Sequence, residues 1–208
     1  MTLYNPIFLH FNLELYIKNE VFYLFAKIRI NTLKLLLALF FAAALPAHAV
    51  DKCPNFLNHD LAKLHSNETV NLCTMAVGKP ILVINTASYC GYTGQFEGLE
   101  KLHQKYQDKG LVVVGFVSND FYQEASSEQE TAKVCRLNYG VSFTMIASSV
   151  VKGPLANPVF KAINKQSKQP TWNFNKYLLN ADGQVVNYFA SHVDPNSARL
   201  ITAIEAVL

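Results

Sequence analysis

Apolar residues alternate between two spacings in residues 78–208, and each spacing predicts one kind of element. Residues 81–87 (ILVINTA) form a short β-branched run of the kind found in buried strands. Apolar side chains recur at helical spacing over residues 96–106, and Gly110 ends this predicted helix. Residues 111–117 form a second continuous apolar run. Two uniformly apolar strands on either side of a helix indicate a parallel pair that is covered on both faces.

Further elements follow in the second half of the chain. Ser127 and Glu130 have the spacing of a capping box and predict a helix that runs to about Asn138. Asp194 and Pro195 suit the N-cap and the first residue of a final helix. The same reasoning predicts three more strands, the last two joined by an Ala-Asp-Gly turn: residues 141–146, 174–179 and 184–189.

The predicted order is strand, helix, strand, helix, strand, strand, strand, helix. This order fits an α/β protein of thioredoxin-like fold, with a mixed central sheet flanked by helices on both faces. Residues 50–208 contain no internal repeat and no linker rich in Gly, Ser or Pro, so we expect a single domain there.

Residues 1–49 have the pattern of a leader that precedes the domain. Lys34 precedes an apolar run at residues 35–45, and Ala-His-Ala at 47–49 is a cleavage signal; together they are typical of a secretory signal peptide cut after Ala49. The run is shorter than the about 20 apolar residues that cross a bilayer, so a membrane anchor or a buried helix is the weaker alternative. We therefore expect an exported protein, periplasmic or secreted, without membrane attachment after cleavage.

Composition narrows the classes of partner and cofactor. Half of the residues are hydrophobic, which excludes a disordered chain, and a net charge of +3 is too small and too evenly spread to favour nucleic acid. The four cysteines all follow the leader, and export places them where disulfides persist. No pair of cysteines or histidines has the spacing of a zinc site, so we expect no metal and no other cofactor.

Cys90 is the candidate for a reactive thiol. It lies between the predicted strand 81–87 and the predicted helix 96–106. The free N–H groups and the partial positive charge at a helix N-terminus favour the thiolate, which is the nucleophilic form of cysteine. Gly91 lets other parts of the chain approach the sulfur. A buried cysteine that acts only as a small apolar residue is the alternative, and local spacing does not separate the two.

Three segments together resemble the glutathione peroxidase family. They follow the family's order at about its spacing, and the resemblance covers residues 78–190. The resemblance implies a thiol peroxidase that reduces hydrogen peroxide or organic hydroperoxides. The three segments are residues 85–93 (NTASYCGYT), residues 115–124 (GFVSNDFYQE) and residues 172–178 (WNFNKYL), the last of which contains the only tryptophan of the chain.

The resemblance assigns roles to individual residues. Cys90 becomes the peroxidatic cysteine, and the other members of the family's catalytic tetrad are matched by Gln123, Trp172 and Asn173. Neutral amide and indole donors can hold a thiolate and the peroxide oxygens without competing for a proton. Taken singly, each of these three residues has an ordinary alternative: exposed loop for Gln123, core anchor for Trp172, turn residue for Asn173.

Cys135, in TAKVCRLNYGV (residues 131–141), resembles the resolving cysteine of the family's thioredoxin-dependent branch. The implied cycle passes from a sulfenic acid on Cys90 to a Cys90–Cys135 disulfide, which a thioredoxin-like protein reduces. Because Cys135 lies within a predicted helix, we expect that helix to loosen during resolution. A core-facing cysteine is the alternative. Glutathione is the alternative reductant, although no cluster of Arg residues is present to hold its carboxylates.

Cys53 and Cys73 remain once the resemblance assigns the other two cysteines to the cycle. Four cysteines allow three pairings, and sequence alone does not choose among them. Export makes a Cys53–Cys73 disulfide plausible, and such a disulfide would hold the segment that precedes the first long strand.

Two departures from the family pattern limit what carries over. Tyr122 replaces a glycine beside Gln123, which leaves the conformation of this loop and the reach of Gln123 open. The segment from Pro158 to Trp172 is shorter than in tetrameric relatives, which favours a monomer or a weak dimer.

Two other classes of function also fit the sequence: a peroxide-driven redox sensor or disulfide exchange protein on the same fold, and a non-enzymatic binding domain braced by its cysteines.

Overall fold

The computed structural model describes residues 53–208 together with Lys27. The predicted signal peptide and its cleavage site after Ala49 lie outside the described residues, Lys27 apart, and stay a prediction. No helix among the described residues combines the length and the apolar character that a membrane span requires.

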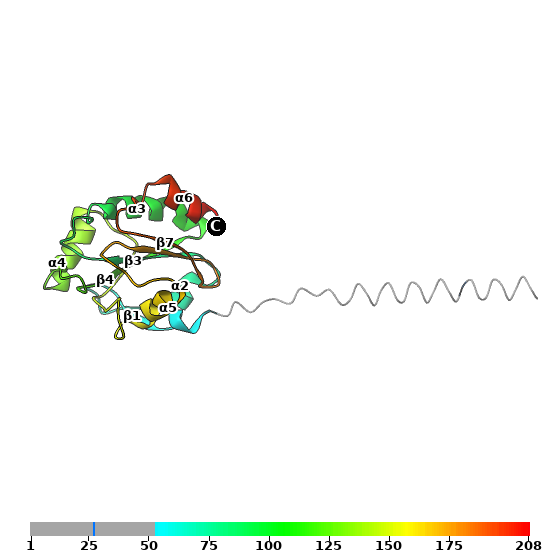
Figure 1. Ribbon diagram of the computed structural model, residues 1–208, viewed down its shortest axis with the longest axis horizontal. Coiled ribbons are helices and arrows are strands. Elements are labelled where there is room, and N and C mark those ends of the chain that lie inside the picture. The colour runs from blue at the N-terminus through cyan, green and yellow to red at the C-terminus, as the bar shows by residue number, and fades with distance from the viewer. Residues whose placement is uncertain (1–26, 28–52) are drawn as a thin grey trace, which may run out of the picture. The chain divides into compact units, whose positions relative to one another are not determined.

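A five-stranded mixed sheet lies at the centre of the described domain (Figure 1). Its strands have the order β5–β4–β3–β6–β7, in which β3, β4 and β5 are parallel while β6 and β7 are antiparallel to their neighbours. The parallel pair expected from the two apolar runs is thereby confirmed. The strands are β3 (Ile81–Thr86), β4 (Val112–Val117), β5 (Thr144–Ile146), β6 (Lys176–Leu179) and β7 (Val185–Phe189).

Helices cover both faces of the sheet, with α3 and α6 on one face and α2 and α5 on the other (Figure 1). Alternate residues of β3 pack into opposite layers, because successive side chains of a strand point to opposite faces. Leu82 and Ile84 join the α3/α6 core, whereas Ile81 and Val83 join the α2/α5 core. The thioredoxin-like α/β fold is confirmed. The helices are α2 (Leu72–Ala76), α3 (Gln95–Tyr106), α5 (Pro158–Gln166) and α6 (Ala198–Glu205), and a 3-10 turn, η2 (Gln107–Lys109), extends α3.

A small hairpin precedes the main sheet and covers one of its edges. It consists of β1 (Asp60–Ala62) and β2 (Thr69–Asn71), which follow a 3-10 turn, η1 (Asn55–Leu57). The chain just after β1 runs along β5, because the N–H of Leu64 donates to the carbonyl of Met145 (2.9 Å). This contact covers part of the edge of β5, which would otherwise present unpaired backbone groups.

The predicted helix 127–138 forms, but in two parts. Ser127 caps α4 (Glu128–Ala132), and its Oγ accepts from the N–H of Glu130 (3.3 Å). The chain then continues as a π-helix, η3 (Lys133–Asn138), which contains Cys135. π-Helical turns are rare and are frequently found at functional sites.

The final helix begins later than the sequence indicates. Its N-cap is Ser197, whose Oγ accepts from the N–H of Leu200 (3.4 Å), so the predicted N-cap at Asp194 is wrong. The reason is that the Asp194 carboxylate accepts from the N–H of Asn196 (2.7 Å) and closes a turn of its own.

Two further elements differ from the sequence prediction. The strand expected at 141–146 is shorter and begins at Thr144. The helix α5 was not predicted, although Pro158 stands at its first position and Asn157 caps it by accepting from the N–H of Phe160 (3.0 Å). These two residues are an ordinary helix start signal.

Cys53 and Cys73 form a disulfide, with their Cα atoms 5.6 Å apart. The disulfide joins the segment before η1 to α2, and both cysteines pack with the α2/α5 core. A disulfide that closes a loop of this length stabilises the fold mainly by restricting the unfolded chain, by about 3 kcal/mol in the chain-entropy model.

We expect the double variant Cys53→Ser/Cys73→Ser to lower the free energy of unfolding by about 3 kcal/mol. Urea titration followed by circular dichroism measures this difference. Dithiothreitol should bring the wild-type protein to the same midpoint, because the other two cysteines are already free thiols. An unchanged midpoint in the double variant would show that the disulfide contributes nothing to stability.

Candidate functional site

The topology of the sheet brings three distant segments to one edge. Cys90 follows the carboxyl end of β3, and Gln123 follows the carboxyl end of β4, which runs parallel to β3. Trp172 and Asn173 precede β6, which is antiparallel to β3 and pairs its first residue, Lys176, with Ile84. The beginning of β6 therefore lies at the same edge as the ends of β3 and β4. The residues that resemble a catalytic tetrad share this edge.

Asn85 fastens the Trp172 segment to β3. It is fully buried in a strand that is otherwise almost wholly apolar. Its side-chain amide donates to the carbonyl of Trp172 (3.0 Å) and its Oδ1 accepts from the N–H of Asn175 (3.1 Å). Its carbonyl accepts from the N–H of Phe174 (2.6 Å). The sequence contained a signal for this role, because a polar side chain in a buried strand requires hydrogen-bond partners.

Gln123 contacts both of the other segments. Its carbonyl accepts from the N–H of Tyr89, the residue before Cys90 (2.9 Å). Its Oε1 accepts from the side-chain amide of Asn173 (3.0 Å). Since Asn173 holds the amide oxygen, the NH₂ group of Gln123 is the end that can donate to a reactant. Asn173 is fully buried, and its Oδ1 has no partner among residues 53–208.

Two residues with left-handed backbone stand directly beside this amide pair. Tyr122 precedes Gln123 and has φ 56°, and Phe174 follows Asn173 and has φ 61°. This backbone conformation is unfavourable for a residue with a large side chain and is readily adopted by glycine. This explains why a glycine fits position 122 in the family pattern. The strain at both positions is held by surrounding structure, as is common at functional sites. Gln123 reaches Asn173 even with a tyrosine at position 122.

Cys90 lies in the turn that leads from β3 into α3. Its side chain is 6% exposed, and its Sγ accepts from the N–H of Tyr92 (3.5 Å). The carbonyl of Cys90 accepts from the N–H of Thr93 (3.0 Å), which fixes the turn before α3 begins at Gln95. In the part of the chain that the structure describes, no hydrogen bond joins the Sγ to the side chains of the other tetrad residues.

Trp172 lies at the surface of this edge rather than in the core. Its side chain is 41% exposed, and its ring packs against that of Phe121 with centroids 5.4 Å apart. Phe121 belongs to the same loop as Gln123, so the aromatic contact joins the loop after β4 to the segment before β6. The exposure of the indole does not fit the alternative of a core anchor.

Cys135 is almost fully buried and is not bonded to Cys90. Its Sγ donates to the carbonyl of Thr131 (2.9 Å), one turn earlier. Burial raises the pKa of the Cys135 thiol to about 11, so this sulfur is protonated at neutral pH. Cys90 and Cys135 belong to the same apolar core, and both are free thiols.

Glu124 is a site residue that the sequence analysis did not single out. Its carboxylate accepts from the N–H (3.0 Å) and the Oγ (2.5 Å) of Ser88, two residues before Cys90. The same carboxylate accepts from Oγ1 of Thr131 in α4 (2.6 Å). A charged residue in a predicted loop gave no sequence signal for these contacts, because they depend on how the loops pack. No group of three or more potential metal ligands occurs within the described residues.

Comparisons with known proteins agree on one family. The family model described as "Glutathione peroxidase" matches residues 58–164. A glutathione peroxidase of Lactococcus lactis subsp. cremoris is 42% identical over 147 residues, which are 68% of this chain and 92% of the relative. "Glutathione peroxidase-like peroxiredoxin gpx1" of Schizosaccharomyces pombe is 44% identical over 137 residues, which are 63% of this chain and 85% of the relative.

A comparison with solved structures finds the same fold. The protein in "Crystal structure of Trgpx in apo form" superposes with a TM-score of 0.57 and 28% identity, over 73% of this chain and 94% of the other. The family model spans half of the chain, and the Lactococcus relative is similar over nearly its whole length. The chain therefore belongs to the glutathione peroxidase family and is a peroxidase.

Proposed function

We propose that this peroxidase is an exported thiol peroxidase that reduces hydroperoxides through Cys90 and is recycled through Cys135. The observation that carries the proposal is the position of Cys90, on the loop whose backbone bonds to Gln123 while Gln123 bonds to Asn173. A nearly buried sulfur, a positioned amide donor and a half-exposed indole occupy one edge of the sheet.

In the first step, the Cys90 thiolate attacks one oxygen of the peroxide. The sulfur–oxygen bond forms as the O–O bond breaks, and the leaving oxygen takes up a proton to become water or an alcohol. Cys90 is oxidised to a sulfenic acid and the peroxide is reduced. Once peroxide is bound, the amide NH₂ of Gln123 and the indole N–H of Trp172 are the donors proposed to stabilise charge on the leaving oxygen. Asn173 acts by holding the Gln123 amide in place.

In the second step, the Cys135 sulfur attacks the sulfenic sulfur of Cys90. A disulfide forms, the S–O bond breaks, and hydroxide leaves with the thiol proton as water. The buried thiol of Cys135 must first leave its hydrogen bond to Thr131, so the α4–η3 segment has to open. An external dithiol then reduces the Cys90–Cys135 disulfide to two thiols and is itself oxidised to a disulfide.

A thioredoxin-like protein is the reductant that we propose. Relatives from Schizosaccharomyces pombe, Chlamydomonas reinhardtii and Saccharomyces cerevisiae are named glutathione peroxidase-like peroxiredoxins. Cys135 supplies the second thiol that converts the sulfenic acid into a protein disulfide, the form that a dithiol protein reduces. The chain is proposed to act as a monomer or a weak dimer, because the segment from Pro158 to Trp172 is short.

Export is proposed from the leader pattern together with the Cys53–Cys73 disulfide. Structural disulfides persist in oxidising compartments and are rare in the cytosol, so the bond supports a periplasmic or secreted location. After cleavage the protein is proposed to have no membrane attachment.

Replacing Cys90 by Ser is expected to abolish peroxide consumption, because the nucleophile is lost. Replacing Cys135 by Ser is expected to permit one oxidation per protein molecule and to stop turnover with a dithiol protein. Peroxide consumption and NADPH oxidation measure both effects. The double variant Cys53→Ser/Cys73→Ser is the matched control and should still turn over. Normal turnover of Cys135→Ser would remove the resolving role.

The reductant is tested with the wild-type protein in two parallel NADPH-coupled assays, one with thioredoxin and its reductase, the other with glutathione and its reductase. We expect a higher kcat/KM for peroxide reduction with thioredoxin, and we expect Cys135→Ser to remove that advantage. A higher kcat/KM with glutathione would contradict the proposed reductant while leaving the peroxidase chemistry intact.

Export is tested by expressing the full chain and separating the cell fractions. We expect the mature protein outside the cytoplasm, with Val50 as its first residue by N-terminal sequencing. A cytoplasmic protein that retains residues 1–49 would contradict the export proposal.

A further inference from the structure

The segment that carries Cys135 is held in place mainly by polar contacts. We call residues 128–138, which comprise α4 and η3, the resolving segment. Only three of its side chains are buried, those of Thr131, Ala132 and Cys135. A segment that buries so little apolar surface opens at low cost. Its hydrogen bonds to neighbouring loops therefore have a large share in keeping it closed.

The first set of contacts joins the resolving segment to the Cys90 loop, which comprises residues 87–94 between β3 and α3. The hydroxyl of Tyr89, directly before Cys90, donates to the carboxylate of Glu130. Glu124 accepts from Ser88 on one side (2.5 Å, from Oγ) and from Thr131 on the other (2.6 Å, from Oγ1). The carbonyl of Thr131 is the acceptor for the Cys135 thiol, so one chain of hydrogen bonds runs from the Cys90 loop to Cys135.

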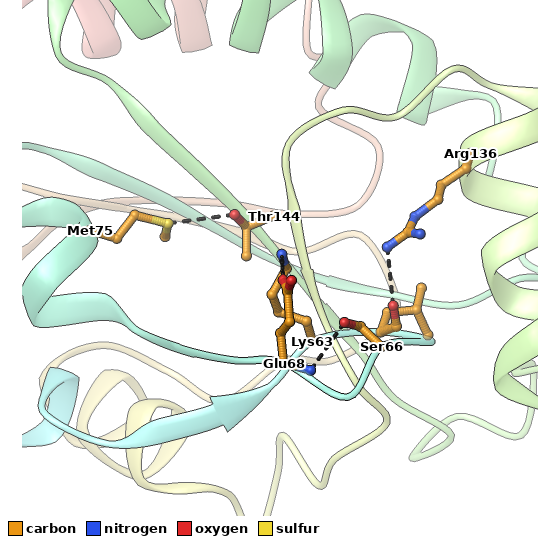
Figure 2. A network of polar contacts seen from close by, with 7 residues as sticks. Lys63, Ser66, Glu68, Met75, Arg136 and Thr144 are labelled. Carbon is orange, nitrogen blue, oxygen red and sulfur yellow. Dashed lines mark hydrogen bonds and ion pairs between the residues drawn. The ribbon is translucent and has the colours of Figure 1, made fainter.

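The second set of contacts joins the resolving segment to the turn between β1 and β2. Arg136 reaches across and donates to the carbonyl of Leu64 (3.1 Å; Figure 2). Glu128 accepts from the N–H of His65 (2.9 Å). The turn itself is held by the ion pair of Lys63 with Glu68 (2.7 Å; Figure 2). None of these hydrogen bonds joins the resolving segment to the Cys90 loop.

The two sets have different consequences when Cys90 reacts. Ser88 and Tyr89 are the two residues that precede Cys90. A displacement of the Cys90 loop therefore distorts the hydrogen bonds of the first set directly. The second set ends on a hairpin that is separate from that loop and can remain bonded. Cys135 lies in the π-helical part of the segment, a geometry that is rare and frequently found at functional sites.

We propose that Tyr89 and Glu124 are positioning residues for the resolving step: their contacts hold the resolving segment closed, and the release of these contacts limits the rate at which Cys135 reaches the oxidised Cys90. The proposal rests on the roles proposed above for the two cysteines. The closed segment keeps Cys135 as a buried thiol, and opening exposes it to the sulfenic sulfur.

The opening of the segment is tested first in a protein that has no peroxidase chemistry. In a Cys90→Ser background with the Cys53–Cys73 disulfide intact, Cys135 is the only thiol that iodoacetamide can alkylate. We expect Tyr89→Phe to raise the alkylation rate about fivefold, which corresponds to about 1 kcal/mol in the opening equilibrium. Tyr122→Phe, on the neighbouring loop with a side chain 91% exposed, is the matched control and should leave the rate unchanged.

A double-mutant cycle identifies the bond responsible. Glu130→Ala removes the acceptor for the Tyr89 hydroxyl, and its effect on alkylation should equal that of Tyr89→Phe. Combining the two substitutions should add little, because both remove the same hydrogen bond. Additive effects would show that Tyr89 and Glu130 act separately and would overturn the proposed contact.

The second readout is the resolving step in the protein with Cys90 present. Trp172 is the only tryptophan and lies at the site, so stopped-flow fluorescence follows the reaction with hydrogen peroxide. We expect a phase whose rate rises with peroxide concentration and a later phase whose rate does not. Tyr89→Phe should accelerate the later phase about fivefold and change the first phase less than about twofold. A substitution that only destabilised the fold would not divide the two phases in this way.

Glu124 is tested with Thr131→Val, which removes a hydroxyl that donates to the Glu124 carboxylate and leaves Glu124 in place. We expect faster alkylation of Cys135 and a faster later phase, as for Tyr89→Phe. Unchanged rates in both readouts for Thr131→Val and Tyr89→Phe would overturn the inference while the peroxidase function stands. Faster alkylation together with normal turnover of Cys135→Ser would instead remove the resolving role itself.

Discussion

The antiparallel pairing of β3 with β6 is the constraint on which the site depends. It places the start of β6 beside the end of β3, so that residues 87 positions apart in sequence meet, as in the bond from Asn85 to Trp172. Four hydrogen bonds of the buried Asn85, two from its side chain and two from its backbone, fix this junction, and a buried polar group without such partners would be costly. The amide of Asn173 reaches Gln123 only because the segment is held there.

The sequence contained most of the architecture because the apolar patterns of β3, β4 and α3 are strong and local. It did not predict where a helix begins when more than one residue could serve as its N-cap. Asp194 resembles an N-cap but closes a turn, and only the packed chain decides that Ser197 caps α6. The helix α5 has an N-cap and a Pro at its start, but with nine residues it is too short for a clear helical pattern of apolar residues.

The residues of the candidate site likewise fall into those that the sequence predicted and those that it could not predict. Cys90, Gln123, Trp172 and Asn173 were identified by resemblance, and their meeting at one edge follows from the strand order. Glu124 and Tyr89 could not be predicted, because their contacts join two loops whose relative position depends on tertiary packing. Tyr122 adopts the left-handed backbone itself, so the site accommodates a tyrosine where the family pattern has a glycine. In the proposed cycle, the strands position the peroxidatic side, while a segment with few buried side chains supplies the second thiol.

The most direct test of the central claim is the identity of the disulfide that peroxide creates. The protein with both free cysteines reduced is treated with one equivalent of hydrogen peroxide, digested without reduction, and analysed by mass spectrometry. The account predicts a new peptide pair linked through Cys90 and Cys135, alongside the existing Cys53–Cys73 pair. Cys90 recovered as an unmodified thiol, with the peroxide consumed or not, would contradict it.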